Sequence, residues 1–218
     1  RTTSDDRLPR GGRRAKHDVI VAAVRTTARG EVAALTSTGR MIRLPVLDMP
    51  AVPPTNDAPN LAGGAPLAEF LALDKNERVI GLASLSADGP GVALGTAQGV
   101  VKRVLTDYPA NKDAWELIPL KPGDEVVGAV ELVTGEEDLV FVSTDAQLLR
   151  FSAIQVRPQG RAAGGMAGVR LAARTRVLWF GAVDPEAEAC VVTVAGASGA
   201  LPGTGGGSVK VAPYPEFP

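Results

Sequence analysis

The stretch VVGAVEL at residues 126–132 is one copy of a repeat that decides the fold. Similar runs stand at 19–24 (VIVAAV), 79–85 (VIGLASL) and 177–183 (VLWFGAV), so successive copies start 60, 47 and 51 residues apart. β-Branched residues dominate these short runs, and glycine or charged residues bound them, which is typical of β-strands.

Each copy is followed by a second run and a tight turn. The second runs are VAAL at 32–35, VAL at 92–94, LVFV at 139–142 and VVTV at 191–194. The turns after them read TSTG, TAQG, TDAQ and GASG, and glycine at the last position of three supplies the positive φ that a hairpin turn often needs. A third run with basic residues follows in three units: RMIRL at 40–44, VVKRV at 100–104 and LLRF at 148–151. We expect the fourth unit to lack this strand, because ALPGTGGG at 200–207 takes its place.

Units of about 50 residues, each a small antiparallel meander, indicate propeller blades. A single such sheet cannot bury both of its faces, so the blades must stack around an axis. We therefore predict an all-β, propeller-like disc of four-stranded antiparallel blades, about four in number and forming one domain. The predicted parts are the end of a preceding blade with a basic connector (1–16), three blades (17–77, 78–124 and 125–176) and a partial blade (177–218). A β-sandwich of irregular hairpins is the alternative.

Charge is distributed unevenly along the 218 residues. The chain as a whole has a net charge of −1, but residues 1–43 carry a net +6 and residues 44–145 a net −10. Residues 146–183 contain six arginines and no acidic residue. Two basic zones separated by an acidic one are compatible with a one-sided phosphate-binding surface, and equally with ordinary variation along a solvated surface.

Several other kinds of site are excluded or disfavoured. Cys190 is the only cysteine, so no internal disulfide can form, and its apolar neighbours predict a buried structural thiol. His17 is the only histidine, which rules out a histidine-based metal cluster and a Ser-His-Asp triad, and structural zinc is not expected. The acidic cluster at 136–138 is interpreted as a charged hairpin turn rather than a cation site. The glycine-rich run at 203–207 lacks the Lys-Ser/Thr of a phosphate-binding loop. No cofactor, membrane span or secretory signal is expected, which predicts a cytoplasmic protein.

Two stretches resemble a known family closely: TGEEDLVFVS at 134–143 and IQVRPQGRAAGGMAGVRL at 154–171. The second is similar to the Arg-Pro-x-Gly-Arg connector repeated in the carboxy-terminal domain of bacterial type IIA topoisomerase A subunits, those of DNA gyrase and topoisomerase IV. The resemblance implies a β-pinwheel, a disc in which neighbouring blades exchange a strand and around whose basic rim duplex DNA bends.

The same resemblance implies a function. The chain would bind double-stranded DNA without sequence preference and wrap it for an ATP-dependent type II topoisomerase, whose A and B subunits form a heterotetramer associated with the nucleoid. The catalytic tyrosine, the ATPase and the metal site of that enzyme lie in other domains, so the chain itself would be non-catalytic and take no small-molecule substrate. Tyr108 and Tyr214, the two tyrosines present, are interpreted as packing residues.

Departures from the family pattern indicate which kind of full-length A subunit the chain would come from. Gyrases carry the box Gln-Arg-Arg-Gly-Gly-Lys-Gly, and the nearest match here is PRGGRR at 9–14. The incomplete box favours an actinobacterial-type parent similar to topoisomerase IV, or a divergent gyrase. The connector at 60–64 (NLAGG) keeps the glycine pair without basic residues, and the one at 111–115 (NKDAW) lacks the glycine pair. Family members usually have five or six blades, so we expect this chain to be a fragment.

Basic residues at strand ends and in connectors would lie on the rim of such a disc, where they can approach phosphates. The candidates for DNA binding are Arg10, Arg13, Arg14, Lys16, Arg40, Arg43, Lys102, Arg103, Arg150, Arg157, Arg161 and Arg170. The competing interpretation is a solvated hairpin edge, where Lys and Arg discourage aggregation. Two other functions remain open: a propeller-like scaffold that binds a protein partner through the acidic zone at 44–145, and a propeller hydrolase.

Overall fold

The computed structural model describes residues 20–51, 65–195 and 208–217, and these residues form β-strands and short 3-10 helices. Within them, no helix is long and apolar enough to cross a membrane. The strands are β1 (Val32–Thr36), β2 (Arg40–Leu44), β3 (Val79–Ser84), β4 (Val92–Thr96), β5 (Val100–Val104), β6 (Ala114–Glu116), β7 (Val126–Glu131), β8 (Asp138–Ser143), β9 (Leu148–Ser152), β10 (Pro158–Gln159), β11 (Met166–Ala167), β12 (Val177–Val183), β13 (Cys190–Ala195) and β14 (Ser208–Pro213). The 3-10 helices are η1 (Val46–Asp48), η2 (Leu67–Glu69), η3 (Ala153–Gln155) and η4 (Tyr214–Glu216).

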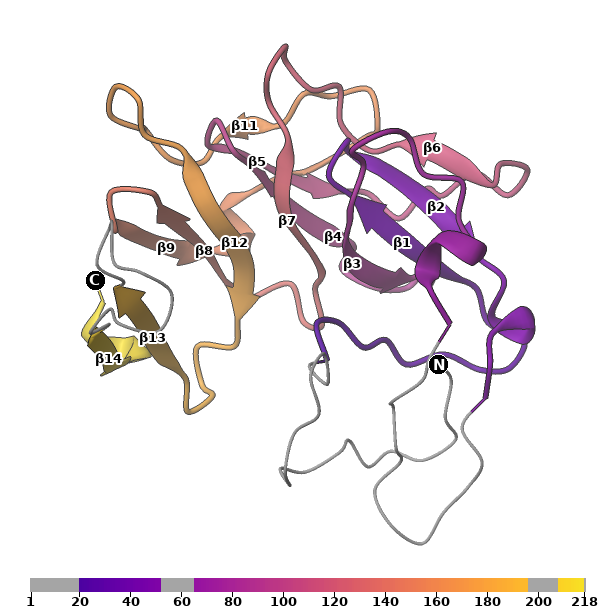
Figure 1. Cartoon of the computed structure of the whole chain (residues 1–218), viewed down its shortest axis with the longest axis horizontal. Helices are drawn as coiled ribbons and strands as arrows, with labels where there is room; N and C mark the ends of the chain where they lie inside the picture. Colours follow the sequence, from indigo (N-terminus) through magenta and orange to yellow (C-terminus); the bar gives the residue numbers. More distant parts are fainter. Residues whose placement is uncertain (1–19, 52–64, 196–207, 218) are drawn as a thin grey trace, which may run out of the picture.

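The strands assemble into sheets that exchange strands between units. The first sheet has the order β3-β1-β2-β6, so the hairpin β1–β2 pairs with the strand that opens the next unit and with a strand from a later connector. The second has the order β7-β4-β5, with β10 and β11 both beside β5. The third has the order β12-β8-β9, and the fourth is the hairpin β13–β14. The sheets follow one another in chain order across Figure 1, from indigo β1 to yellow β14. The predicted all-β, strand-exchanging fold is confirmed.

All strand pairs are antiparallel except β10, which runs parallel to β5. Because β3 (79–84) belongs to the first sheet and β7 (126–131) to the second, a unit read along the sequence is not a sheet in space. The unit bounds therefore remain a prediction about sequence periodicity.

Two expectations about strands were wrong. Residues 20–24 of the first run form no strand. In this topology the opening run pairs with the hairpin of the preceding unit, and the described residues contain no such hairpin before it. In the fourth unit, β14 occupies the place of the third strand, which we expected to be missing. Its alternating valines and lysine (SVKVAP) lie after the glycine-rich stretch, whose residues 196–207 are outside the described part of the chain.

The cores lie between successive sheets. Leu35 and Met41 of the first sheet pack with Leu94 of the second, and Val101 of the second packs with Phe141 of the third. All five side chains are almost completely buried. Burial of this kind stabilises a fold by roughly 1.5–3 kcal/mol per large apolar side chain. The apolar alternation in the strands is therefore satisfied by stacking of sheets, as a propeller-like fold requires.

Glycine was expected to shape the hairpin turns, and Gly39 (φ 78°) and Gly99 (φ 85°) do so in the first two units. In the third turn, Ala146 takes up the left-handed conformation instead (φ 62°). The turn type is therefore kept although the glycine is absent.

Cys190 is exposed, so the expectation of a buried thiol was wrong. The apolar run around it forms β13, whose only described partner is β14. Val192 and Val211 face each other across this hairpin and are 55% and 60% exposed. One face of the fourth sheet is therefore uncovered by the described residues, and Cys190 lies on that face by strand alternation.

Candidate nucleic-acid interface

The connectors lie at one edge of the sheets and the unit-opening strands at the other. Strand β7 packs against both β3 and β12, so these three strands line the inner side of the stack. The connector strands β6, β10 and β11 pair with β2 and β5 at the opposite edge, which is the outer rim. Basic residues in the connectors are thus placed where a duplex can approach from outside.

Arg40, a predicted DNA-binding residue, is held by carboxylates of its own protein. Its guanidinium pairs with the buried Glu77 and lies 3.3 Å from an oxygen of Asp74. The hydrogen bond from Arg40 to Glu77 raises the pKa of the guanidinium further. Burial by itself raises the pKa of Glu77, but hydrogen bonds from Arg40 and from threonine hydroxyls outweigh it and lower that pKa to about 2. This pair is a structural anchor.

Arg43 and Arg103 occupy the same register in β2 and β5, opposite Ala33 and Ala93. Both turn their guanidinium groups onto backbone carbonyls. Arg43 donates to Pro109 O (2.7 Å) and lies over the ring of Trp115, 5.3 Å from its centroid. Arg103 makes longer hydrogen bonds, with Pro90 O at 3.3 Å and Ala153 O at 3.5 Å. These arginines hold loops together at the sheet edges.

Lys102 is completely buried, with 0% of its surface exposed. Its Nζ donates to Leu117 O (2.6 Å), Arg161 O (3.0 Å) and Ala163 O (2.6 Å). The three donors of the ammonium are thereby satisfied. The expectation that Lys102 lies on the surface was wrong, because a long side chain at a strand position can fold inward when carbonyls receive its charge. It cannot reach a phosphate in this conformation.

Arg150 lies in β9 between two side chains. Its NH1 is 3.5 Å from Asp138 Oδ2, and its guanidinium sits 4.8 Å from the ring centroid of Tyr214. Tyr214 is buried and its hydroxyl donates to the same Asp138 oxygen (3.0 Å). The expectation that Tyr214 is a packing residue is confirmed, and Arg150 is largely used in holding η4 against the third sheet.

Arg157, Arg161 and Arg170 differ from the others. They lie in the connector between β9 and β12, and within the described chain no hydrogen bond or ion pair occupies their guanidinium groups. Arg157 and Arg170 are exposed and Arg161 is half-buried. Of the described candidates, these three keep their charge free for a ligand. Arg10, Arg13, Arg14 and Lys16 lie outside the described residues.

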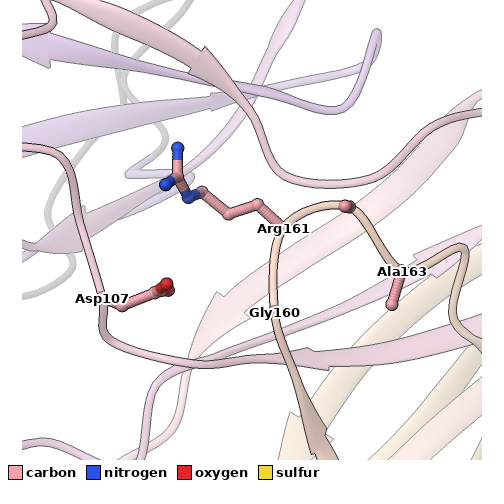
Figure 2. Close-up of a pocket in the computed structure, with 5 residues that line it drawn as sticks. Asp107, Gly160, Arg161 and Ala163 are labelled. Atoms are coloured by element: carbon pink, nitrogen blue, oxygen red, sulfur yellow. The ribbon is translucent and has the colours of Figure 1, made fainter.

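The loop between β10 and β11 presents Arg161 beside a shallow pocket. Gly160, Arg161 and Ala163 line it together with Asp107 from the segment after β5. Figure 2 shows the Arg161 and Asp107 side chains extending into the same open space beside the loop. The Asp107 carboxylate makes the mouth of this pocket mixed in charge, so the pocket alone does not select an anion.

The connector contains four glycines with different roles. Gly165 has a φ of 79°, and a Cβ there would lie 2.7 Å from Val101 O. A Cβ on Gly168 would meet the ring of Phe141 at 2.7 Å. At Gly160 and Gly164, by contrast, a Cβ would meet nothing within 4 Å, and φ is not positive. Neither packing nor backbone conformation explains these two glycines, whereas a close approach of the loop backbone to a ligand would.

Sequence reasoning missed two further arginines beside this connector. Arg174 is exposed, adopts a φ of 65° and has no side-chain partner in the described chain. Arg176 is exposed and lies 4.0 Å from Glu125, which also pairs with Arg78 at 2.8 Å. The signal was available, since both arginines belong to the acid-free stretch at 146–183.

The acidic zone at 44–145 offers less free charge than its composition indicates. Glu77 is buried beneath Arg40, and Glu131 accepts from the backbone N and the hydroxyl of Ser84 (2.9 and 2.5 Å). Glu137 is buried too, and its carboxylate accepts from three backbone N–H groups of the turn at 133–135. The cluster at 136–138 therefore lies where the chain passes from β7 of the second sheet into β8 of the third, and the predicted hairpin was wrong because these two strands do not pair with each other. No group of three or more potential metal ligands occurs in the described residues.

The connector lies within the part of the chain that matches a known protein family. Residues 137–179 match the family described as "DNA gyrase C-terminal domain, beta-propeller". The chain is 35% identical to the DNA gyrase A protein of Mycolicibacterium smegmatis over 167 residues, which make up 74% of this chain and 19% of that protein. It is 28% identical to the DNA gyrase A protein of Salmonella typhimurium over 183 residues, 82% of this chain and 20% of that protein. The chain thus spans about a fifth of the length of these curated relatives.

Solved structures show the same fold. The C-terminal domain of a DNA topoisomerase IV superimposes with a TM-score of 0.68 at 23% identity, covering 88% of this chain and 55% of that one. A DNA gyrase A C-terminal domain gives a TM-score of 0.55 at 18% identity, covering 78% of this chain and 53% of that one. These structural neighbours therefore have the same architecture as this chain.

Proposed function

Because this chain belongs to the family of carboxy-terminal domains of type IIA topoisomerase A subunits, we propose that it binds duplex DNA without reading its sequence and bends the duplex along its rim. The observation that carries this proposal is the set of connector arginines without a partner in the described chain, Arg157, Arg161 and Arg170. Charged donors on an outer edge suit phosphate contacts, which fix position along DNA but carry no base information.

The connector backbone supports the same proposal. Gly160 and Gly164 flank Arg161 in a loop whose outer side is open. The absence of a Cβ at the two glycines allows their backbone N–H groups to approach a phosphate, and arginine can bind the same phosphate with two donors. Arg174 extends the basic surface toward β12.

The role of the whole protein forms part of the proposal. The domain would present a bent DNA segment to an ATP-dependent type II topoisomerase assembled from A and B subunits in the nucleoid. Catalysis, ATP and Mg²⁺ would then belong to other parts of that assembly. We infer a parent nearer to topoisomerase IV than to a strongly supercoiling gyrase, since the box at 9–14 is incomplete.

Binding is tested by titrating duplex DNA at several salt concentrations. We expect affinity to fall steeply with salt and to vary little with sequence, because counterion release drives such binding. The variant R157A/R161A/R170A should bind more weakly on every duplex, with a salt slope smaller by about 0.9 for each phosphate that is no longer neutralised. The matched control is R78A, which removes an exposed arginine that is already paired with Glu125. Absent or salt-insensitive binding by the unmodified chain overturns the proposal.

Wrapping needs a separate measurement. Ligation of nicked circular DNA in the presence of the chain should trap a change in linking number if the duplex wraps around the disc, and the sign of that change gives the handedness. Binding with no change in linking number would restrict the function to bending.

A further inference from the structure

We propose that Lys102 is a positioning residue for DNA binding: its buried ammonium ties the connectors of two adjacent blades together and so fixes where Arg161 meets the duplex. The inference rests on the proposed function of the connector. It goes beyond that function because Lys102 itself would not contact DNA but would fix the position of Arg161, which would.

The carbonyls that receive Lys102 come from two different connectors. Leu117 follows β6, the connector strand at the outer edge of the first sheet. Arg161 and Ala163 lie in the loop between β10 and β11, the connector strands beside β5 in the second sheet. One ammonium group therefore joins the rims of two sheets at the base of the loop that carries Arg161.

The fold itself does not require a lysine at this place. Ile42, Lys102 and Arg150 occupy equivalent register positions in β2, β5 and β9, opposite Ala34, Leu94 and Val140. In the first sheet an isoleucine fills the position and is buried at 6% exposure. Burying a charge is costly, and an apolar side chain of similar size is often as stable or more stable. The lysine thus supplies something that packing alone does not, namely direct attachment of the Arg161 loop.

Burial lowers the pKa of Lys102, and the net value is about 8 because nearby carboxylates oppose part of this effect. The charged groups that face it are Glu116 of β6 and Asp107 after β5, both of which favour the charged ammonium. The connector between β9 and β12 also packs against Lys102. Its charged residue there is Arg161, whose backbone carbonyl accepts a hydrogen bond from the ammonium. Loss of the proton converts the ammonium into an amine with two donors for three carbonyls, so the attachment should weaken above neutral pH.

The first test compares DNA affinity of the unmodified chain and K102M, which keeps the length of the side chain and removes its charge. We expect about a tenfold loss, a size typical of coupling between neighbouring groups. Hydrogen exchange should quicken at the amides of 160–165 while the strand amides stay protected. The matched control is I42M at the equivalent position of the first sheet, which should leave affinity unchanged.

A double-mutant cycle separates positioning from simple loss of charge. If Lys102 acts through Arg161, the losses of DNA affinity in K102M and R161A will not add. The reason is that R161A removes the same guanidinium that K102M misplaces. The control is the pair K102M and R170A, whose losses of DNA affinity should be closer to additive. Additive losses for K102M and R161A overturn the inference, as does unchanged affinity of K102M.

A pH profile supplies a readout that a purely structural role would not move. Affinity of the unmodified chain should fall as the pH rises through about 8, whereas K102M should show no such step. K102R retains a charge throughout this range and should restore affinity at alkaline pH. If the unmodified chain does not bind DNA at all, the proposed function fails; if it binds but K102M matches it at every pH, only the role of Lys102 fails.

Discussion

The Arg40 guanidinium covers the buried carboxylate of Glu77 and donates to both of its oxygens. This pairing joins β2 to the segment just before β3, so it holds the stretch that leads into the next predicted unit against β2. Thr38 of the hairpin turn donates to the same carboxylate. An arginine that we predicted to bind DNA from the sequence thus pairs with a carboxylate of its own unit and holds the segment before β3 in place.

Removal of the Glu77 charge should destabilise the protein at neutral pH. The pKa of Glu77 is about 2, below its ordinary 4.5, so ionisation favours the folded state. We expect E77Q to lower the free energy of unfolding by roughly 3 kcal/mol at pH 7, measured by urea denaturation.

The same pair predicts how stability depends on acid. A carboxyl group with a lowered folded pKa contributes stability above its unfolded pKa, and that contribution is lost as pH falls from about 4.5 toward 2. The difference between the unmodified chain and E77Q should therefore shrink over this window. A difference that stays constant down to pH 2 would contradict the assignment.

The packing of one sheet on the next should be sensitive to a single methyl group at Gly128. A Cβ at this position would clash with the backbone carbonyl of Phe180, where β7 packs against β12. G128A should lower the free energy of unfolding by at least about 1–3 kcal/mol, the usual cost of overpacking. Thermal denaturation measures it, and G160A is the control, since a Cβ at Gly160 meets nothing within 4 Å. Equal stability of the two variants would show that β7 and β12 are not closely packed.

Glycines of the connector should separate stability from DNA binding. G160A and G164A should leave stability unchanged or raise it by about 0.5 kcal/mol, because both sites accept an alanine without strain. Both should weaken DNA binding if the loop backbone approaches phosphate. G165A serves as the contrast: its φ of 79° and its closeness to Val101 O predict lower stability. Undiminished affinity in G160A and G164A would place the phosphate contact on side chains alone.

Tyrosine ionisation should be delayed in the folded protein. Burial raises the pKa of Tyr108 to about 12, and burial together with the hydrogen bond to Asp138 raises that of Tyr214 to about 12. Because these are the two tyrosines of the chain, ultraviolet titration of the native protein should show little tyrosinate near pH 10. A raised folded pKa means that stability is present below pH 10 and is lost as pH rises through about 12. Y214F should remove half of the delayed signal, and a native titration centred on pH 10 would contradict the burial of both rings.

Cys190 should react in the native state. The thiol is exposed on β13, so a thiol reagent should label one site per chain without denaturant. C190S should leave the unfolding midpoint within error, because an exposed position contributes little to packing. Labelling that requires denaturant would mean that the uncovered face of the β13–β14 hairpin is covered in solution.

Sequence periodicity predicted the strands well because alternation and turn residues act locally. The runs at 79–85, 126–132 and 177–183 all became strands, and Gly39 and Gly99 took the expected turn conformation. The local pattern could not predict which strand each strand pairs with. The first run has a good strand sequence, yet residues 20–24 form no strand because a strand needs a neighbour as well as a propensity.

The candidate site was harder to predict than the fold, since a basic residue on a strand can point to solvent or to a carbonyl. Arg103 and Arg157 look alike in sequence, but one bonds to Pro90 O and the other has no partner within the described chain. Lys102 is the extreme case, because its burial depends on carbonyls from residues 117, 161 and 163. The absence of acidic residues from 146–183 was the better indicator, and it pointed to the connector arginines.

The exchange of strands between units also sets the order in which the protein can fold during synthesis. The first sheet contains β1 at residues 32–36 and β6 at 114–116, so it cannot be completed until the ribosome has made some 80 residues beyond its first strand. The second sheet waits in the same way for β10 and β11. Nascent hairpins must therefore remain open-edged for some time, a state in which strands can pair wrongly with other chains. The edges of β2 and β5 stay unpaired until the connector strands have been synthesised. Charged residues on these two strands make wrong pairing less favourable during that time.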